Sequence, residues 1–388
     1  MMGGERTAAC TSFIVSGKAT KDGRPLMMKN RDTGTLSNTS RLIQGEKYRY
    51  IGLINAGDSE PEEVWAGHNE AGFAIMNTAA YNLNKKDQKL ELEGQLMKRA
   101  LEICATVKDF EVLLDTFRRP RCVDANFGVI DAQGGCAYFE TGDYDYQKYD
   151  VNDAPEGYIV RTNHGLSGDP DRQQGVERYL CASDVMAKAA ASGQLNVEYL
   201  LENVPRQLTH GLTHDNLYDR MPQTQSEPVM VFFRDYIPRY ITSSCVLFQG
   251  VKPNEEAQHT ISWTIVGHPL TTVAIPLMIT STGKLPKVVS PDEEGRAPLA
   301  EWGLKLKKRI FSWQRGNTGD YIDLSKLINK EGTGIWQKLQ PVEKEVVARG
   351  QEVVAKVRKK KKYVKDLDHY YDWVDSYLTE LYTHEFGL

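Results

Sequence analysis

The feature that most constrains the fold of this chain is a recurring alternation between short apolar runs and pairs of amphipathic segments. The apolar runs have the length and the β-branched or aromatic content of strands, and turn residues separate them. Strands are therefore expected at 11–15, 26–28, 50–54, 73–77, 126–130, 136–140, 147–151, 158–162, 229–233, 241–248 and 261–266. Helical spacing of apolar residues predicts helices over 93–105, 106–117, 174–191 and 197–203. Two stacked, mainly antiparallel sheets with helices outside them satisfy this alternation, so the expected fold class is α+β.

The composition changes at about Pro298, where charged helical segments begin. They are expected at 302–313, 324–328, 342–360 and 363–382. The basic run at 358–362 has no interleaved aromatic residues, so it is interpreted as a solvated helix face and not as a nucleic-acid surface. We expect a helical C-terminal extension at 296–388 that packs on the preceding body, with a homo-oligomer contact there left open.

Composition and charge exclude several classes of protein. Hydrophobic residues make up 40% and charged residues 26% of the 388 residues, as in a soluble globular protein. A net charge of −4 argues against a general nucleic-acid binder, and no apolar run is long enough to span a membrane. The six cysteines form no C-x-x-C pair, and all except Cys10 are interpreted as reduced, mostly buried thiols.

Cys10 begins a predicted β-hairpin that brings charged residues back to its side. The first strand follows directly at 11–15, the turn is at 17–23, and the second strand delivers Lys29-Asn30-Arg31-Asp32. In an antiparallel pair the end of the second strand lies beside the start of the first. A thiol next to a carboxylate and a cation suits a cysteine that attacks a carbonyl carbon. The alternative is an ordinary buried cysteine that acts as a small hydrophobe.

A cysteine nucleophile needs a base or a cation that favours its thiolate. If residues 1–9 are a leader that is removed, Cys10 gains a free α-amine whose unperturbed pKa of about 7.7–8.0 lets it accept the thiol proton. Thr7-Ala8-Ala9 is similar to a small-residue cleavage site. Two explanations stay open: autocatalytic removal of a short leader, or loss of a longer export signal. The chain is expected to be cytoplasmic in the first case and exported in the second.

The hairpin resembles the start of the N-terminal-nucleophile hydrolases of the choloylglycine hydrolase and penicillin acylase group. Acyl-CoA:6-aminopenicillanate acyltransferase-like enzymes and cysteine dipeptidases of lactic bacteria are related branches. These families begin with Cys-Thr and reach an Arg-Asn-x-Asp motif, places that Cys10-Thr11 and Lys29-Asn30-Arg31-Asp32 occupy here. Lysine stands where the family has arginine, so Lys29 or Arg31 is expected to supply the positive charge. The resemblance implies a four-layer αββα sandwich over 10–295, with Asp32 orienting the α-amine.

Three further residues match positions of the same family, over a resemblance that covers about 8–285. Asn77 follows a turn similar to the family's Asn-Glu-x-Gly and takes the place of an oxyanion-hole asparagine, a neutral donor suited to that task. Asn163 matches the asparagine of a Thr-Asn motif, a second polar group at the reacting carbonyl. Arg178 matches an arginine that reaches into the site of bile-salt-hydrolase-like members. The alternative for Arg178 is a solvated charge early in a helix.

Histidines near these motifs are not assigned catalytic roles. His68 beside its turn is interpreted as a surface or packing residue, and His164 as a solvated loop residue. The two histidines of 210–215 lie four residues apart, but Gly211 breaks a helix there and no third ligand has suitable spacing, so a metal site is not expected. This segment is interpreted as a loop that lines the substrate entrance.

Together these residues predict a cysteine amidase that cleaves a linear amide C–N bond through an acyl-enzyme thioester. An acyltransferase or a dipeptidase are the enzymatic alternatives, and a catalytically dead sandwich scaffold is the alternative outside the enzymes. The scheme requires no metal and no organic cofactor. The expected partner is a small-molecule acyl amide or a short peptide, and bile salts, penicillins and N-acyl amino acids all stay open because pocket loops set the choice.

Overall fold

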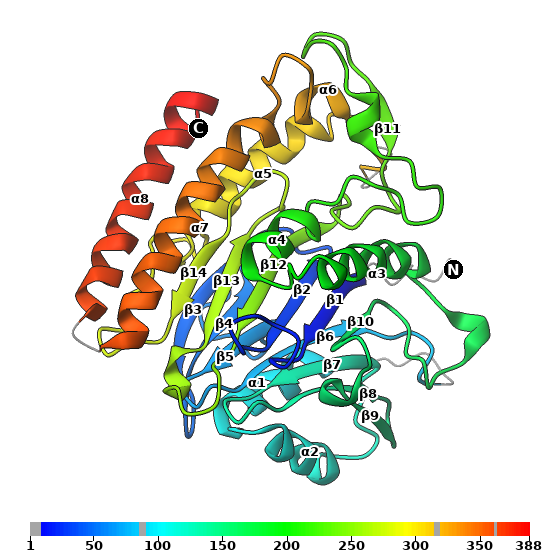
Figure 1. Cartoon of the computed structure of the whole chain (residues 1–388), viewed down its shortest axis with the longest axis vertical. Helices are drawn as coiled ribbons and strands as arrows, with labels where there is room; N and C mark the ends of the chain where they lie inside the picture. Colours follow the sequence, from blue (N-terminus) through cyan, green and yellow to red (C-terminus); the bar gives the residue numbers. More distant parts are fainter. Residues whose placement is uncertain (1–8, 85–90, 314–318, 361–362) are drawn as a thin grey trace.

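Two large antiparallel sheets form the centre of the protein. The computed structural model of the chain describes residues 9–84, 91–313, 319–360 and 363–388, and Figure 1 shows their arrangement. A separate two-stranded sheet pairs β11 (Met230–Phe232) with β15 (Tyr321–Asp323).

The six-stranded sheet carries the predicted hairpin in its interior. Its order is β10-β1-β2-β12-β13-β14, and every neighbouring pair is antiparallel. All residues of the two hairpin strands are buried, because layers cover both faces of this sheet. The strands are β1 (Ala9–Val15), β2 (Leu26–Asp32), β10 (Tyr158–Arg161), β12 (Thr242–Gln249), β13 (Ile261–Val266) and β14 (Ile275–Met278).

The seven-stranded sheet follows chain order from β3 to β9, again with antiparallel neighbours. Side chains alternate between its faces: Ile51 and Leu53 join the core between the two sheets, whereas Tyr50 and Ile54 join a second core. The strands are β3 (Asn38–Gln44), β4 (Arg49–Asn55), β5 (Ala66–Asn69), β6 (Ala74–Ala79), β7 (Ala125–Ile130), β8 (Cys136–Thr141) and β9 (Tyr146–Asp150).

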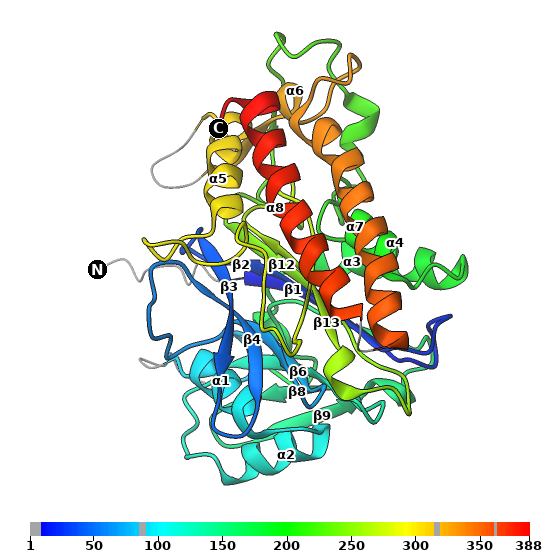
Figure 2. The same cartoon turned by 90° about the vertical axis from the view of Figure 1, so that its left-hand side faces the viewer.

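Helices cover the outer faces of both sheets, as Figures 1 and 2 show. α1 (Glu93–Ile103) and α2 (Val107–Thr116) bury their apolar residues in the second core, against the seven-stranded sheet. The other helices pack on the six-stranded side: α3 (Val176–Ala191), α4 (Val197–Asn203), α5 (Pro298–Ile310), α6 (Leu324–Leu327), α7 (Ile335–Lys359) and α8 (Val364–Phe386). The expected four-layer α+β sandwich with C-terminal helices is therefore confirmed.

Several local predictions can be compared with the structure. The capping box of α2 is present: Thr106 Oγ1 accepts the N–H of Asp109, and the Asp109 carboxylate accepts the N–H of Thr106. The expected start of α7 at residue 342 was wrong, because this helix begins at Ile335 and contains Pro341. Trp336 and Leu339 are buried and extend the apolar face of the helix, and this burial outweighs the proline. Strand β3 was not predicted, since Asn38-Thr39-Ser40-Arg41 has the composition of a loop.

The C-terminal helices share one continuous apolar core with the six-stranded sheet. Tyr382 on α8 donates from its hydroxyl to the carbonyl of Thr271 at 2.8 Å, and the Tyr371 hydroxyl accepts the N–H of Met278 at 3.2 Å. The division into leader, hydrolase domain and extension stays a prediction. Among the helices of the described ranges, none has the length and hydropathy needed to cross a membrane.

Candidate active site

The β1–β2 hairpin places Cys10 among the residues that the sequence singled out. Cys10 lies directly opposite Arg31 in the strand register, and Ser12 lies opposite Lys29. Residues opposite each other in an antiparallel pair share one face, so Cys10, Lys29 and Arg31 all face the seven-stranded sheet. Asp32, opposite Ala9, belongs to the other face. The predicted return of these residues to the start of β1 is confirmed.

Two buried side chains hold the main chain of Cys10. Its N–H donates to Asn163 Oδ1 at 3.0 Å, and its carbonyl accepts from Arg178 Nη1 at 2.7 Å. The same guanidinium donates through Nη2 to Asn163 Oδ1 at 2.8 Å. The alternative of a solvated Arg178 was wrong, because only 2% of this residue is exposed. Asn163 and Arg178 together fix the backbone position of Cys10.

A glycine at the start of α3 makes this contact possible. Gly175 caps the helix with a φ of 75°, in the left-handed region. A Cβ at this position would collide with the guanidinium of Arg178. Gly175 therefore leaves room for the arginine to turn back from the first helical turn toward Cys10.

Lys29 is buried on the same face as Cys10 and bonded to neutral groups. Its ammonium donates to Asn77 Oδ1 at 2.6 Å and to the carbonyl of Trp65 at 2.7 Å. Burial lowers the pKa of Lys29 to about 8, although charge on Cys10 opposes this shift. Because Asn77 turns its oxygen to Lys29, its Nδ2 hydrogens point the other way and can serve as donors.

Arg31 occupies the same face with a different set of partners. Its guanidinium donates to Asn38 Oδ1 and, at 2.9 Å, to Asn55 Oδ1, and lies 4.7 Å from the centre of the Trp65 ring. Burial lowers its pKa to about 10, and charge on Cys10 again opposes the shift. Both expected sources of positive charge, Lys29 and Arg31, are thus near the thiol, and the geometry does not require a choice between them.

Asp32 is anchored from the helical side of the sheet. Its carboxylate accepts from Arg239 Nε at 2.7 Å, from Thr242 Oγ1 at 2.7 Å and from Asn30 Nδ2 at 3.2 Å. The peptide N–H of Cys10 donates to Asn163, and not to Asp32 as the expected orienting role would have it. Asp32 lies opposite Ala9 in the strand register, so its strand partner is the residue that precedes Cys10.

Sequence reasoning missed Arg239, the ion-pair partner of Asp32. It lies in an irregular segment before β12, where an isolated arginine resembles an ordinary solvated charge. Only the strand order reveals it, because β12 is the neighbour of β2 and brings the preceding segment to Asp32. Trp65, whose carbonyl holds Lys29 and whose ring supports Arg31, was also missed, because only the packing of the two sheets on each other brings it to these residues.

Asn163 presents a different atom from the one expected. Its Oδ1 faces the Cys10 nitrogen and Arg178, while its Nδ2 donates to the carbonyl of Ala79 at 2.9 Å. This orientation suits a side chain that accepts a hydrogen bond from the Cys10 nitrogen better than one that donates a hydrogen bond to an oxyanion. Asn77, with its Nδ2 turned away from Lys29, suits the donor role.

The histidines left out of the site lie in varied surroundings. His68 is fully buried, its ring stacks edge-on with Phe248 at 6.0 Å, and burial lowers its pKa to about 3. The expectation that His164 is solvated was wrong: it is 4% exposed, and its Nδ1 lies 2.9 Å from the carbonyl of Gln174. Within the described ranges, no three His, Cys, Asp or Glu side chains gather as metal ligands.

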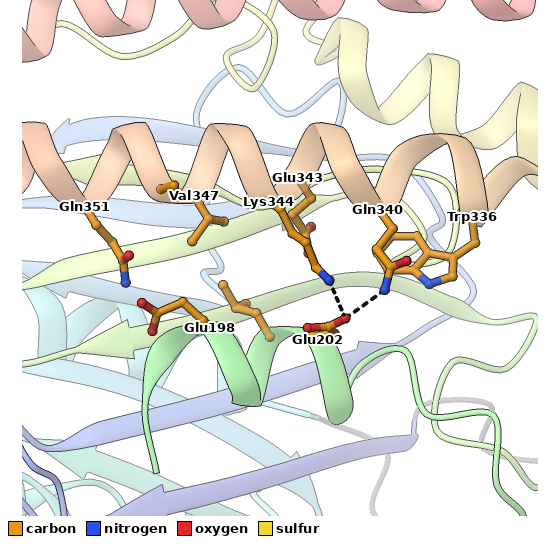
Figure 3. A pocket seen from close by; sticks show the side chains of 10 residues that line it. Glu198, Glu202, Trp336, Gln340, Glu343, Lys344, Val347 and Gln351 are labelled. Carbon is orange, nitrogen blue, oxygen red and sulfur yellow. Dashed lines mark hydrogen bonds and ion pairs between the residues drawn. The ribbon is translucent and has the colours of Figure 1, made fainter. Parts of the chain in front are cut away.

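A separate cavity of about 300 Å³ lies between α4 and α7 (Figure 3). Its lining includes apolar Leu201, Trp336 and Val347 but none of the candidate site residues. Glu202 of α4 connects the two helices: its carboxylate accepts from Gln340 Nε2 at 2.7 Å and pairs with Lys344 Nζ at 3.1 Å, both on α7. This cavity is therefore distinct from the surroundings of Cys10.

The fold and the buried thiol site can be compared with known proteins. No protein-family model matches the sequence, and no curated protein is similar to it. Among solved structures, a mutant conjugated bile acid hydrolase from Clostridium perfringens is 11% identical, with a TM-score of 0.39 over 71% of this chain and 93% of that one. A penicillin V acylase from Agrobacterium tumefaciens is 14% identical, with a TM-score of 0.38 over 70% of this chain and 87% of that one.

A third similar structure is the Caenorhabditis elegans ortholog of N-acylethanolamine-hydrolyzing acid amidase. It is 14% identical, with a TM-score of 0.35 over 50% of this chain and 89% of that one. At TM-scores this low, these likenesses add nothing to what the geometry of the chain itself shows.

Proposed function

We propose that this chain, once residues 1–9 are removed, is an N-terminal-nucleophile cysteine amidase that hydrolyses a linear amide bond. The observation that carries the proposal is the pair of contacts at Cys10. Asn163 Oδ1 holds its nitrogen at 3.0 Å and Arg178 holds its carbonyl at 2.7 Å. Cys10 lies beyond the part of β1 that pairs with β10, and two buried side chains from distant parts of the chain, not a neighbouring strand, hold its main-chain groups there.

Removal of the leader converts the Cys10 peptide nitrogen into an α-amine. Asn163 Oδ1 then accepts one hydrogen of this amine, and the nitrogen lone pair takes the proton of the thiol on the same residue. The charges of Lys29, Arg31 and Arg178 favour the thiolate that results. The base and the nucleophile thus belong to one residue.

The thiolate attacks the carbonyl carbon of the amide, and the electron pair of the C=O bond moves to oxygen. Asn77 Nδ2 donates to this oxyanion, since its own oxygen is engaged by Lys29. The C–N bond then breaks while the Cys10 ammonium gives its proton to the leaving amine, which forms a thioester. Water, deprotonated by the α-amine, attacks the thioester, releases the acid and restores the thiol.

Intact-protein mass spectrometry tests the first requirement, since the mature chain must begin at Cys10. A panel of acyl 4-nitroanilides, carrying acetyl, hexanoyl and phenylacetyl groups, then tests turnover and a mass adduct equal to one acyl group. The adduct must map to Cys10 and be absent from Cys10→Ala. Cys122→Ala is the matched control, because Cys122 is partly exposed and lies outside the site. Turnover by Cys10→Ala, or a mature enzyme that keeps its leader, would refute the proposal.

The same panel separates the finer activities. Hydroxylamine added to the reaction captures the acyl group as a hydroxamate if an amine acceptor enters the site as readily as water, as in an acyltransferase. Unblocked dipeptides serve as a parallel substrate set for dipeptidase action. Hydrolysis that is unaffected by hydroxylamine and absent with dipeptides is the result expected for an amidase.

A further inference from the structure

The cavity between α4 and α7 has an apolar wall that suits the body of a small molecule. Its volume of about 300 Å³ is within the range of small-molecule sites. Leu201 comes from α4, while Trp336 and Val347 come from α7, and all three residues are buried. Figure 3 shows Trp336 at one end of the row along α7 and Gln351 at the other. A ligand that lies along this row would bury apolar surface.

The remaining wall of the cavity is acidic. Three carboxylates, those of Glu198, Glu202 and Glu343, line it together with one ammonium, that of Lys344. Lys344 already pairs with Glu202 at 3.1 Å. Glu198 and Glu202 lie four residues apart on α4, so they share one face of the helix, and like charges at this spacing destabilise a helix. Negative charge is therefore in excess at this wall.

Two of these carboxylates retain acceptor oxygens that no described residue uses. Glu343 is only 6% exposed, and its hydrogen bonds from Arg206 Nη2 and from the N–H of Ala274 both end on Oε2. Its Oε1 takes part in neither bond, and Arg206 does not line the cavity. Within the described ranges, Glu198 forms no hydrogen bond or ion pair. A buried carboxylate oxygen is costly unless a donor meets it, so the cavity favours a ligand that brings a charged donor.

The chemistry of the walls distinguishes between kinds of cation. A metal ion such as Ca²⁺ takes six to eight oxygen ligands around one point. Among the residues that the structure describes, no three His, Cys, Asp or Glu side chains gather in that way. An apolar wall also offers nothing to a hydrated metal ion. An organic cation, by contrast, uses both walls at once.

We propose that the cavity between α4 and α7 binds a small organic cation, an ammonium group joined to an apolar or aromatic body. The ammonium donates to Oε1 of Glu343, Glu198 adds negative charge beside it, and the body packs against Trp336 and Val347. This site lies apart from Cys10 and takes part in no step of the proposed reaction. Its occupant joins α4, on the six-stranded sheet, to α7 of the C-terminal helices.

Isothermal titration calorimetry of the full chain near neutral pH tests this site with three ligands that share an indole body. Tryptamine carries the ammonium, tryptophol a neutral hydroxyl and indole-3-propionate a carboxylate. Tryptamine should bind at one site with a Kd on the order of 0.1–1 mM, as expected for a ligand of this size. The other two should bind at least roughly tenfold more weakly, because they lack the charged donor.

Two exposed positions of the wall allow the site to be altered without touching Glu343, which holds Arg206. Ala348 is exposed and lines the cavity, so Ala348→Trp should fill the space and abolish tryptamine binding. Glu198→Gln should weaken tryptamine binding by roughly two- to fivefold, as for loss of an exposed ion pair, and leave tryptophol unaffected. Glu352→Gln is the matched control, since Glu352 is an exposed glutamate of α7 that does not line the cavity.

Loss of binding in Ala348→Trp would assign tryptamine to this cavity and not to the surroundings of Cys10. Circular dichroism checks that each variant is folded, and Glu198→Gln alone decides if Ala348→Trp is not. Equal affinity of the wild type for tryptamine and tryptophol would overturn the inference, as would the absence of tryptamine binding. Wild-type tryptamine affinity in Glu198→Gln, or equal weakening in Glu352→Gln, would overturn it as well.

Discussion

Replacing Lys307, a buried lysine of α5, by methionine should make the protein more stable, and the lowered pKa of this lysine sets the expected size and pH dependence of the gain. Burial lowers the pKa of Lys307 from 10.5 to about 7, with the charge of Asp32 opposing the shift. Each unit of such a shift corresponds to about 1.4 kcal/mol of differential stability. At pH 7 the buried lysine therefore costs on the order of 4 kcal/mol. Methionine fills a similar volume and carries no charge.

The sign of the pH dependence follows from where the proton binds. Between pH 7 and pH 10.5 the unfolded lysine holds its proton and the folded one does not, so unfolding takes up a proton and wild-type stability rises with pH. Below pH 7 both forms are protonated and the full penalty applies. The advantage of Lys307→Met should therefore be largest at pH 6 and should shrink by about 1 kcal/mol for each pH unit above 7.5.

Urea denaturation of both proteins at pH 6, 7, 8 and 9 measures this difference, because contributions from all other titrating groups cancel between them. Lys308→Met, at an exposed position of the same helix, should change the free energy of unfolding by less than about 0.5 kcal/mol at every pH. A gain for Lys307→Met that stays constant from pH 6 to pH 9 would show that this lysine is not a buried titrating group. A loss of stability would refute the reasoning altogether.

Three further predictions concern single residues. In the wild type, activity should fall as the pH rises through about 8, because Lys29 then loses its proton and its positive charge. Lys29→Met should abolish this fall in activity at alkaline pH, and the same fall in the variant would contradict the prediction. Arg178→Gln should lower kcat by roughly 10²–10³-fold, as for loss of a preorganised donor, with the circular dichroism spectrum retained. Wild-type kcat in that variant would show that the contacts of Arg178 are structural only. Pro341→Ala should raise the free energy of unfolding by about 1–3 kcal/mol, since Pro341 is exposed inside α7, and no change in thermal midpoint would count against this.

The sequence predicted those parts of the fold whose pattern is local. Short apolar runs and turn residues located the β1–β2 hairpin, and its antiparallel pairing predicted that Asp32 returns to the start of the first strand. The Thr106–Asp109 capping box could be read in the same way, because cap and acid lie three residues apart. β3 escaped prediction, since its polar start is held by hydrogen bonds to residues distant in sequence: Asn38 donates to the carbonyl of Ser243 and Ser40 to that of Val289.

Site residues that depend on tertiary contacts were only partly predictable. Resemblance to a family suggested Asn163 and Arg178, but only the fold shows that the asparagine oxygen faces the Cys10 nitrogen. Arg239 carries no local signal, because strand order brings it to Asp32 from far along the chain. Pairings across such distances are not encoded in any short window of sequence.

Cys10 is the second residue of β1, and this position has a consequence for the proposed removal of residues 1–9. Within the described residues β1 begins at Ala9, and the Ala9–Asp32 pair is the part of the ladder that lies before the nucleophile. Cleavage between Ala9 and Cys10 would therefore remove one residue pair of the described ladder, Ala9–Asp32, and leave the pairing from Cys10 onward intact. If residues 1–9 are removed as proposed, the new α-amine of Cys10 therefore forms on a strand whose pairing with β2 is already in place.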